Sequence, residues 1–135
     1  MANVRRVGSV YIVDNDASVR RSLLRLMRAN GLEARCFASA QNFLDEAKSM
    51  QRGCVVLDMT TSTTMGVQLK ARLKEMNAEM PIIATSVRDD SAVRDEARQI
   101  GAKFFLTKPV DNHAWLDAIA WVSESIIRPD DATTD

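Results

Sequence analysis

The sequence alternates, five times over, between a short apolar run and a segment whose apolar residues recur every three or four positions. A short apolar run is typical of a buried strand, and the wider spacing is typical of a helix with one apolar face. We predict strands at residues 10–13, 33–37, 54–57, 81–84 and 104–106. Helices fill the intervals, and a last helix covers about residues 112–127. Because parallel strands need crossover connections, the pattern predicts an α/β fold, a doubly wound five-stranded parallel sheet flanked by five helices.

Four residues mark helix ends. Asn30 and Gly31 follow the first helical segment, and Gly101 follows the fourth. Glycine commonly ends a helix because it accepts the left-handed backbone conformation. Ser39 precedes the second helical segment, where its hydroxyl suits an N-cap.

The length and charge of the chain restrict its class. Its 135 residues suffice for one domain, with 46% hydrophobic and 27% charged residues, as in ordinary globular proteins. Eighteen basic and eighteen acidic side chains cancel, which disfavours direct nucleic-acid binding by this chain because phosphate backbones attract basic proteins. No apolar run approaches the roughly 20 residues of a membrane-spanning helix. The N-terminus has no apolar signal-peptide core, so we expect a cytoplasmic protein without membrane contact.

Two further features complete the organisation of the chain. Residues 1–127 are expected to form the domain, and the polar residues 128–135 a tail or truncated linker. Cys36 and Cys54 lie far apart in the sequence without metal-ligand spacing. We expect them to be small buried hydrophobic residues, with redox sensing as the alternative.

Polar residues follow four of the predicted strands, and in a doubly wound sheet the functional crevice lies beyond these carboxyl ends. These residues are Asp14, Asn15, Asp16, Asp58, Ser86 and Lys108. Converging carboxylates need a cation between them, and a hard, oxygen-lined site suits Mg²⁺. A hydroxyl and a lysine would hold phosphoryl oxygens, and an aspartate can form an acyl phosphate. The arrangement predicts phosphoryl chemistry with Asp58 as nucleophile.

Five segments carry a resemblance to a known family by their order and spacing. They are VYIVD at 10–14, VRRSL at 19–23, VVLD at 55–58 with Gly66 downstream, PIIATS at 81–86, and GA at 101–102 with FLTKP at 105–109. Over about residues 10–122 the chain resembles the receiver domain of bacterial two-component response regulators, FixJ-like branch. The resemblance implies a flavodoxin-like or CheY-like fold with strand order 2-1-3-4-5.

The resemblance also implies a function in phosphorelay signal transduction. A sensor histidine kinase or a phosphotransfer protein would pass a phosphoryl group to Asp58. Asp14, Asn15, Asp58 and the backbone carbonyl of Thr60 fall at the positions that hold Mg²⁺. Such a domain is not an enzyme, beyond phosphorylating itself from small phosphodonors and dephosphorylating itself.

Three residues match the phosphate-binding and switch positions of the family. Ser86 falls at the hydroxyl position, Phe105 at the aromatic position, and Lys108 at the lysine whose peptide bond to Pro109 is usually cis. Phosphorylation would draw Ser86 inward and let Phe105 follow. The surface formed by the fourth helix, the fifth strand and the last helix would then change, which is where a homodimer is expected.

The sequence departs from the family pattern at three places. Asn15 stands where the family usually has an acidic residue, which predicts weaker Mg²⁺ binding and slower phosphorylation. Asp16 could compensate, but its place before a helix favours N-capping. Residues 60–64 read TTSTT where a Met-Pro-like pair is usual, so the loop is less pre-organised. Val87 replaces a small residue and is expected to narrow access for the phosphodonor.

These departures leave two alternatives open. The first is a degenerate pseudo-receiver, a protein-interaction module that works without phosphorylation. The second is a haloacid-dehalogenase-like phosphatase, because residues 14–19, DNDASV, resemble its Asp-x-Asp motif. In that family the first aspartate, here Asp14, is the nucleophile and the second is a general acid. That hypothesis lacks a final acidic pair on a later strand and leaves Asp58 without a role.

Two surfaces are candidate interfaces. Arg21, Arg25 and Arg28 share the polar face of the first helix; similar receivers bind their kinase beside this helix, and a merely solvated face is the alternative. Trp121 points away from the apolar stripe of the last helix. Because an exposed tryptophan is unfavourable, we expect it at or beside a dimer or output-domain contact, with packing against the fourth helix as the alternative. His113 is expected at the surface.

Overall fold

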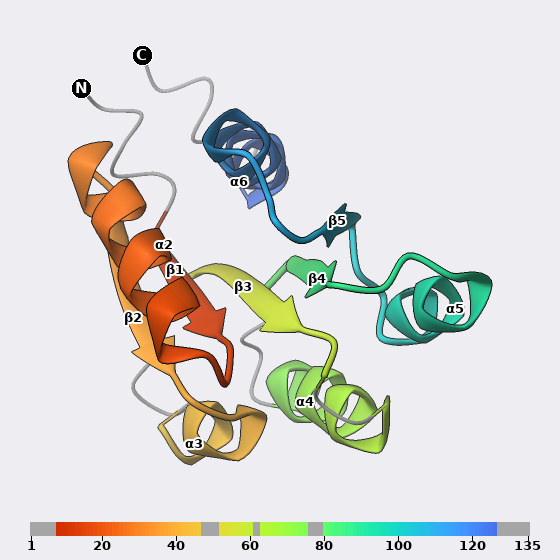
Figure 1. Ribbon diagram of the computed structural model, residues 1–135. Coiled ribbons are helices and arrows are strands. Elements are labelled where there is room, and N and C mark those ends of the chain that lie inside the picture. The colour runs from red at the N-terminus through yellow and green to blue at the C-terminus, as the bar shows by residue number, and fades with distance from the viewer. Residues whose placement is uncertain (1–7, 47–51, 61–62, 76–79, 127–135) are drawn as a thin grey trace.

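The computed structural model describes residues 8–46, 52–60, 63–75 and 80–126, and it contains a five-stranded parallel sheet in the order β2-β1-β3-β4-β5 (Figure 1). The predicted fold class and strand order are confirmed. The strands are β1 (Ser9–Val13), β2 (Glu33–Phe37), β3 (Gly53–Asp58), β4 (Ile82–Ser86) and β5 (Phe104–Thr107). The helices are α2 (Ala17–Ala29), α3 (Ala40–Asp45), α4 (Thr63–Glu75), α5 (Ser91–Gln99) and α6 (Asn112–Ile126).

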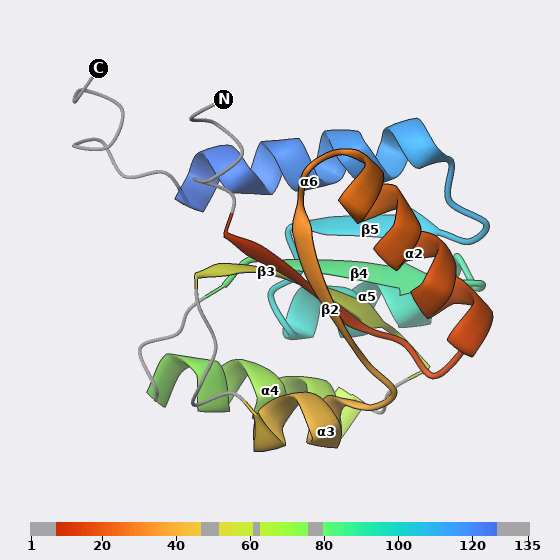
Figure 2. The same ribbon diagram turned by 90° about the vertical axis from the view of Figure 1, so that its left-hand side faces the viewer.

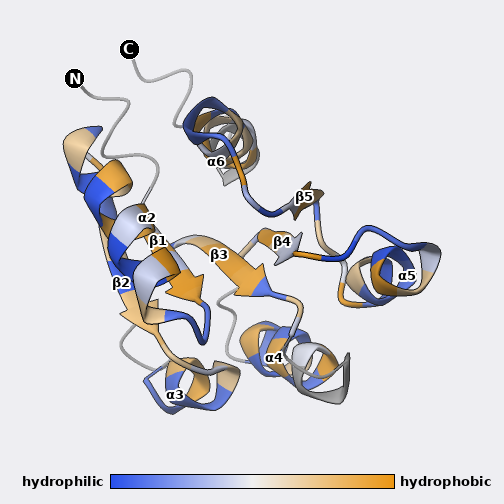
Figure 3. Cartoon of the chain, in the orientation of Figure 1, coloured by the Kyte–Doolittle hydropathy of each residue, from blue (hydrophilic) through white to orange (hydrophobic). Residues whose placement is uncertain are grey.

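The sheet separates two hydrophobic cores. Helices α2 and α6 cover one face, and α3, α4 and α5 cover the other (Figures 1 and 2). Alternate residues of a central strand enter opposite cores. In β1, Tyr11 and Val13 pack with Phe43 of α3, whereas Val10 and Ile12 pack towards α2 and α6. β1 and β3 are hydrophobic, and the carboxyl tip of β3 turns hydrophilic (Figure 3). Burial on both faces explains why the strands read as continuous apolar runs.

Three strands extend further at their carboxyl ends than the apolar runs predicted, and β5 does so by one residue, to Thr107. β3 ends at Asp58 and β4 at Ser86, so both polar residues belong to the sheet instead of following it. Asp58 pairs with Thr85 in the β3–β4 register, and Ser86 pairs with Thr107. The backbone N–H of Met59 also donates to the Thr85 carbonyl at 2.8 Å. Backbone pairing does not depend on side-chain polarity, so hydropathy alone placed the strand ends too early.

The predicted helix ends agree with the structure. The Ser39 side chain accepts a hydrogen bond from the Asn42 backbone N–H at 3.1 Å and caps α3. Gly31 and Gly101, which follow α2 and α5, have φ angles of 74° and 76°. A side chain is strained in that left-handed region, and this explains glycine at both positions.

Helix α6 buries Trp115, Ile119 and Val122, whereas Trp121 is 63% exposed. The prediction that Trp121 points away from the apolar stripe is confirmed. Its ring meets Phe104 of β5 edge-on, with centroids 5.7 Å apart. The side chain of Ile126, residue 127 and the expected tail at 128–135 lie outside the described residues.

Both cysteines are free thiols. Cys54 is fully buried in the α2/α6 core, and burial raises the pKa of its thiol to about 12. Cys36 is half-buried; burial also raises its pKa, although Arg20 and Arg28 oppose the shift. Raised pKa values disfavour the reactive thiolate, in agreement with the expected packing role. No helix in the described ranges is long and apolar enough to span a bilayer.

Gly66 of α4 provides a test of the packing between α4 and α5. A β-carbon there would lie 2.8 Å from Cγ2 of Ile100, which is 1% exposed. Gly→Ala within a helix normally stabilises by about 0.5–1 kcal/mol. Here the clash reverses the sign, and we expect Gly66→Ala to lower the free energy of unfolding by roughly 1–3 kcal/mol. Guanidinium denaturation measures this, with the exposed Gln68→Ala as control; an equally or more stable Gly66→Ala would contradict the packing.

Candidate functional site

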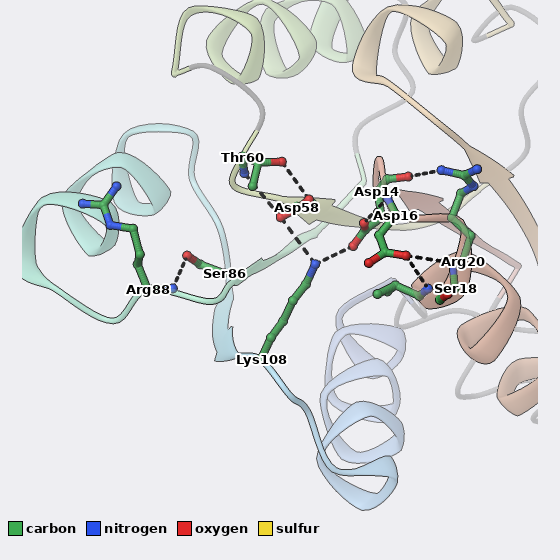
Figure 4. Close-up of polar contacts among 10 residues, drawn as sticks. Asp14, Asp16, Ser18, Arg20, Asp58, Thr60, Ser86, Arg88 and Lys108 are labelled. Carbon is green, nitrogen blue, oxygen red and sulfur yellow. Dashed lines mark hydrogen bonds and ion pairs between the residues drawn. The ribbon is translucent and has the colours of Figure 1, made fainter.

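The carboxyl edge of the sheet brings together three charged side chains from segments far apart in sequence (Figure 4). Asp14 follows β1, Asp58 ends β3, and Lys108 follows β5. The Lys108 Nζ lies 2.8 Å from Asp14 Oδ2 and 3.6 Å from Asp58 Oδ1. The expected convergence of these three groups is therefore present. The peptide bond between Lys108 and Pro109 is cis.

The charges in this cluster do not balance. Asp14 and Asp58 are 3% and 2% exposed, and the Lys108 side chain is 16% exposed. One ammonium therefore faces two buried carboxylates, which leaves an excess negative charge. Buried charges need partners because desolvation is costly, so this edge of the sheet favours an additional cation.

In the segment after β1, hydrogen bonds hold both Asp14 and Asp16 in place. Asp14 Oδ1 accepts from the Asp16 backbone N–H at 2.9 Å, and the Asp14 carbonyl accepts from Arg20 Nη1 at 2.6 Å. The Asp16 side chain accepts from the backbone N–H groups of Ser18 and Val19, at 2.8 and 3.4 Å. The predicted capping role of Asp16 is confirmed. Asp16 Oδ1 is therefore hydrogen-bonded to the amino end of α2.

Thr60 contacts the candidate nucleophile directly. Its hydroxyl Oγ1 donates to Asp58 Oδ2 at 2.8 Å, and its backbone N–H approaches Asp58 Oδ1 at 3.3 Å. The family pattern drew attention only to the carbonyl of Thr60. The hydroxyl contact was missed, although a threonine two residues after an aspartate often forms such a local hydrogen bond.

Ser86 occupies the same edge but is engaged elsewhere. Its Oγ accepts from the Arg88 backbone N–H at 2.9 Å, and the residue is 5% exposed. Val87 is 69% exposed beside it; its effect on access stays a prediction. Thr85, the strand partner of Asp58, is 1% exposed, and its hydroxyl has no hydrogen-bond partner among the described residues. Neither the spacing nor the hydropathy of this segment indicates that the Thr85 hydroxyl is buried.

Phe105 is half-buried and packs against the core beneath α5. The guanidinium carbon of Arg94 lies 4.8 Å from the centre of its ring. Arg94 Nε donates to Asp89 Oδ1 at 2.5 Å, and this hydrogen bond is the main reason why the pKa of Asp89 is lowered. The sequence analysis identified Phe105 and missed the arginine over it.

The remaining candidates lie at the surface. Asn15 is exposed, unlike the two aspartates. The side chains of Arg21, Arg25 and Arg28 are exposed along α2, and His113 is exposed at the start of α6.

The donor atoms at this edge fit a hard divalent cation. Within the described residues, no three His, Cys, Asp or Glu side chains form a group able to hold a metal ion. Magnesium usually keeps several water ligands and binds through one or two carboxylates. Asp14 and Asp58 supply that number, and Asn15 and the Thr60 carbonyl are neutral oxygen donors in the same two segments.

Comparison with known proteins shows the family of this chain. A family model described as the response regulator receiver domain matches residues 10–120. The transcriptional regulatory protein TdiR of Thauera aromatica is 41% identical over 111 residues, which cover 82% of this chain and 49% of that protein. The transcriptional regulatory protein FixJ of Bradyrhizobium diazoefficiens is 34% identical over 121 residues, 90% of this chain and 57% of FixJ.

The similarity extends to solved structures. The crystal structure of full-length FixJ from B. japonicum matches with a TM-score of 0.78 and 31% identity, over 91% of this chain and 60% of that one. The chemotaxis protein CheY4 of Vibrio cholerae has a TM-score of 0.75 at 19% identity, over 86% of this chain and 98% of CheY4, which supports the fold alone. The chain spans about half the length of the curated relatives that it matches.

The charge imbalance predicts how the site responds to loss of its lysine. Lys108→Met leaves two buried carboxylates without their shared cation, and we expect the free energy of unfolding to fall by about 3 kcal/mol in EDTA. Millimolar Mg²⁺ should restore part of that loss. Urea denaturation with and without Mg²⁺ measures both effects. The control is Lys103→Met, an exposed position where the change stays within about 0.5 kcal/mol; equal losses in the two variants would refute the pairing.

Proposed function

Since this chain belongs to the family of response regulator receiver domains, we propose that it serves two-component phosphorelay signalling by accepting a phosphoryl group on Asp58. Receiver domains are signalling domains and generally not enzymes. The observation that carries the proposal is the position of Lys108, with its ammonium between the buried Asp14 and Asp58 carboxylates. The phosphodonor would be a phosphohistidine of a sensor histidine kinase or of a phosphotransfer protein.

The proposed step is a displacement at phosphorus. An oxygen of the Asp58 carboxylate attacks, the phosphorus–nitrogen bond of the phosphohistidine breaks, and the imidazole leaves with its electron pair and takes up a proton. The products are an acyl phosphate on Asp58 and a free histidine in the partner. The ammonium of Lys108 neutralises the phosphoryl oxygens, because such transfer depends mainly on positioning and charge neutralisation.

Receiver domains typically use Mg²⁺ at this site, and the residues present fit it. Asp14, Asp58 and the Thr60 carbonyl, together with the Asn15 amide, would hold the ion, which supplies further charge neutralisation when bound. Arg20 fixes the Asp14 carbonyl, and the Asp16 N–H fixes the Asp14 carboxylate. These contacts keep a metal-binding carboxylate oriented in advance.

The response would travel through Ser86. Its hydroxyl oxygen now accepts from the Arg88 N–H; after phosphorylation the hydroxyl would turn to donate to a phosphoryl oxygen, Phe105 would follow, and the surface of α5, β5 and α6 would change. Homodimerisation would use this surface, with Trp121 at or beside the contact. On the other side of the site, the exposed Arg21, Arg25 and Arg28 would form the docking face for the kinase.

One observation supports a second candidate, a pseudo-receiver that signals without phosphorylation. Asn15 lacks the usual negative charge, and Asp16 does not replace it because its side chain caps α2. The same cap removes support from the phosphatase hypothesis, which needs Asp16 as a general acid.

Phosphorylation separates the two candidates. With acetyl phosphate and Mg²⁺, the protein should gain the mass of one phosphoryl group, and Asp58→Ala should gain none. The adduct should decay in the absence of phosphodonor, because an acyl phosphate hydrolyses. Intact-mass spectrometry measures both, with the exposed Asp117→Ala as control. A wild-type protein that never gains the adduct, or an adduct that survives Asp58→Ala, would favour the pseudo-receiver.

The missing charge at residue 15 makes a separate prediction. Asn15→Asp should lower the Mg²⁺ concentration that half-saturates phosphorylation on the order of tenfold, because affinity depends on the charge of the ligand set. Titrating the phosphorylation rate with Mg²⁺ measures this. Asn30→Asp, at the opposite end of α2, is the matched control. If Asn15→Asp behaves like Asn30→Asp, the amide does not limit binding.

A further inference from the structure

A chain of contacts connects Ser86 to Phe105 through the loop between β4 and α5. Ser86 Oγ accepts from the backbone N–H of Arg88 at 2.9 Å. The next residue, Asp89, accepts from Arg94 Nε at 2.5 Å. The guanidinium of Arg94 lies over the ring of Phe105, 4.8 Å from its centre. The two residues assigned to switching are thus linked by two side chains that have no assigned role.

The same loop is also fixed to the start of α5. The Arg88 guanidinium donates to Asp90 Oδ2 at 2.9 Å, while Asp90 Oδ1 accepts from the Val93 backbone N–H at 3.0 Å and caps the helix. Asp89 lies between Arg88 and Asp90 and contacts Arg94 of α5 and the Thr107 side chain of β5. When the Arg88 backbone moves away from Ser86, its neighbour Asp89 is displaced, and the displacement reaches Arg94 through their hydrogen bond.

A guanidinium over an aromatic face is attractive because the face of the ring is electron-rich. Phe105 therefore cannot leave its position without losing the contact with Arg94. Asp89 in turn orients the Arg94 guanidinium, because it accepts a hydrogen bond from Arg94 Nε and so restricts rotation of the guanidinium plane. The Arg94 and Asp89 side chains are 49% and 47% exposed. Because exposed ion pairs are weak, the contact that restrains Phe105 can be broken during switching.

We propose that Arg94 is a positioning residue for the switch, held by Asp89, which keeps Phe105 in its resting position and couples it to Ser86. This inference rests on the proposed function, because it concerns the same conformational change. Loss of Arg94 lets the ring leave its resting position without phosphorylation. In the proposed function phosphorylation and the switch are coupled, so we expect molecules released into the switched conformation to be phosphorylated faster.

The helix offers a matched control. Arg98 of α5 makes a similar exposed ion pair, its Nη1 lying 2.6 Å from Asp95 Oδ1. Arg94→Ala should increase the rate of phosphorylation by acetyl phosphate about two- to fivefold, and Arg98→Ala should not change it. In a Phe105→Leu background Arg94→Ala should have no further effect, because its action passes through the ring. An unchanged rate in Arg94→Ala, or the same increase in the Phe105→Leu background, would overturn the assignment.

A second measurement does not depend on phosphorylation. In protein with ¹³C-labelled phenylalanine, the ring signals of Phe105 are identified by their loss in Phe105→Leu. Arg94→Ala should move them towards the averaged shifts of a mobile ring. Asp89→Asn, which keeps the guanidinium but releases it, should move them in the same direction, and Arg98→Ala should not. Unmoved Phe105 signals in both Arg94→Ala and Asp89→Asn overturn the role of Arg94, whereas a wild type that gains no phosphoryl group overturns the proposed function instead.

Discussion

The ammonium of Lys108 is the interaction on which the site depends. Lys108 lies 94 positions after Asp14 in the chain, and its ammonium donates a hydrogen bond to the Asp14 carboxylate. It also approaches the carboxylate of Asp58. Without it, folding would place two carboxylates together at the buried end of the sheet. With it, the site is stable enough to form and still carries one uncompensated negative charge. That remaining charge makes the edge suitable for a cation, and a bound cation would also offset the negative oxygens of an incoming phosphoryl group.

The surrounding hydrogen bonds orient this cluster. Arg20 and the Asp16 N–H fix Asp14, and Thr60 binds the carboxylate of Asp58. Asp16 is the informative case, because its Oδ1 accepts from the backbone N–H groups of Ser18 and Val19. The acidic residue that follows Asn15 is therefore engaged by the amino end of α2.

Much of the fold and part of the site could be predicted from the sequence. Strands buried on both faces produce apolar runs, and glycines with positive φ mark helix ends, so the parallel sheet and the helix ends were accessible from the residues. The strand order came from the resemblance to receiver domains. Strand ends were not, because Asp58 and Ser86 pair through their backbones. Contacts that depend on the direction of a side chain were also missed, because the sequence does not indicate where a side chain points in the folded chain. Nothing in the spacing of Arg94 and Phe105 indicates that one covers the other, since α5 and β5 meet only in the folded chain.

Asp58 is the last residue of β3, and its backbone is paired with β4. The Asp58 carboxylate is therefore positioned by the hydrogen-bonded ladder of the sheet. The Thr60 hydroxyl, which donates to Asp58 Oδ2 at 2.8 Å, orients a carboxylate whose backbone the sheet has already placed. The sheet sets where the side chain lies, and the first residue after the strand sets how its carboxylate is turned.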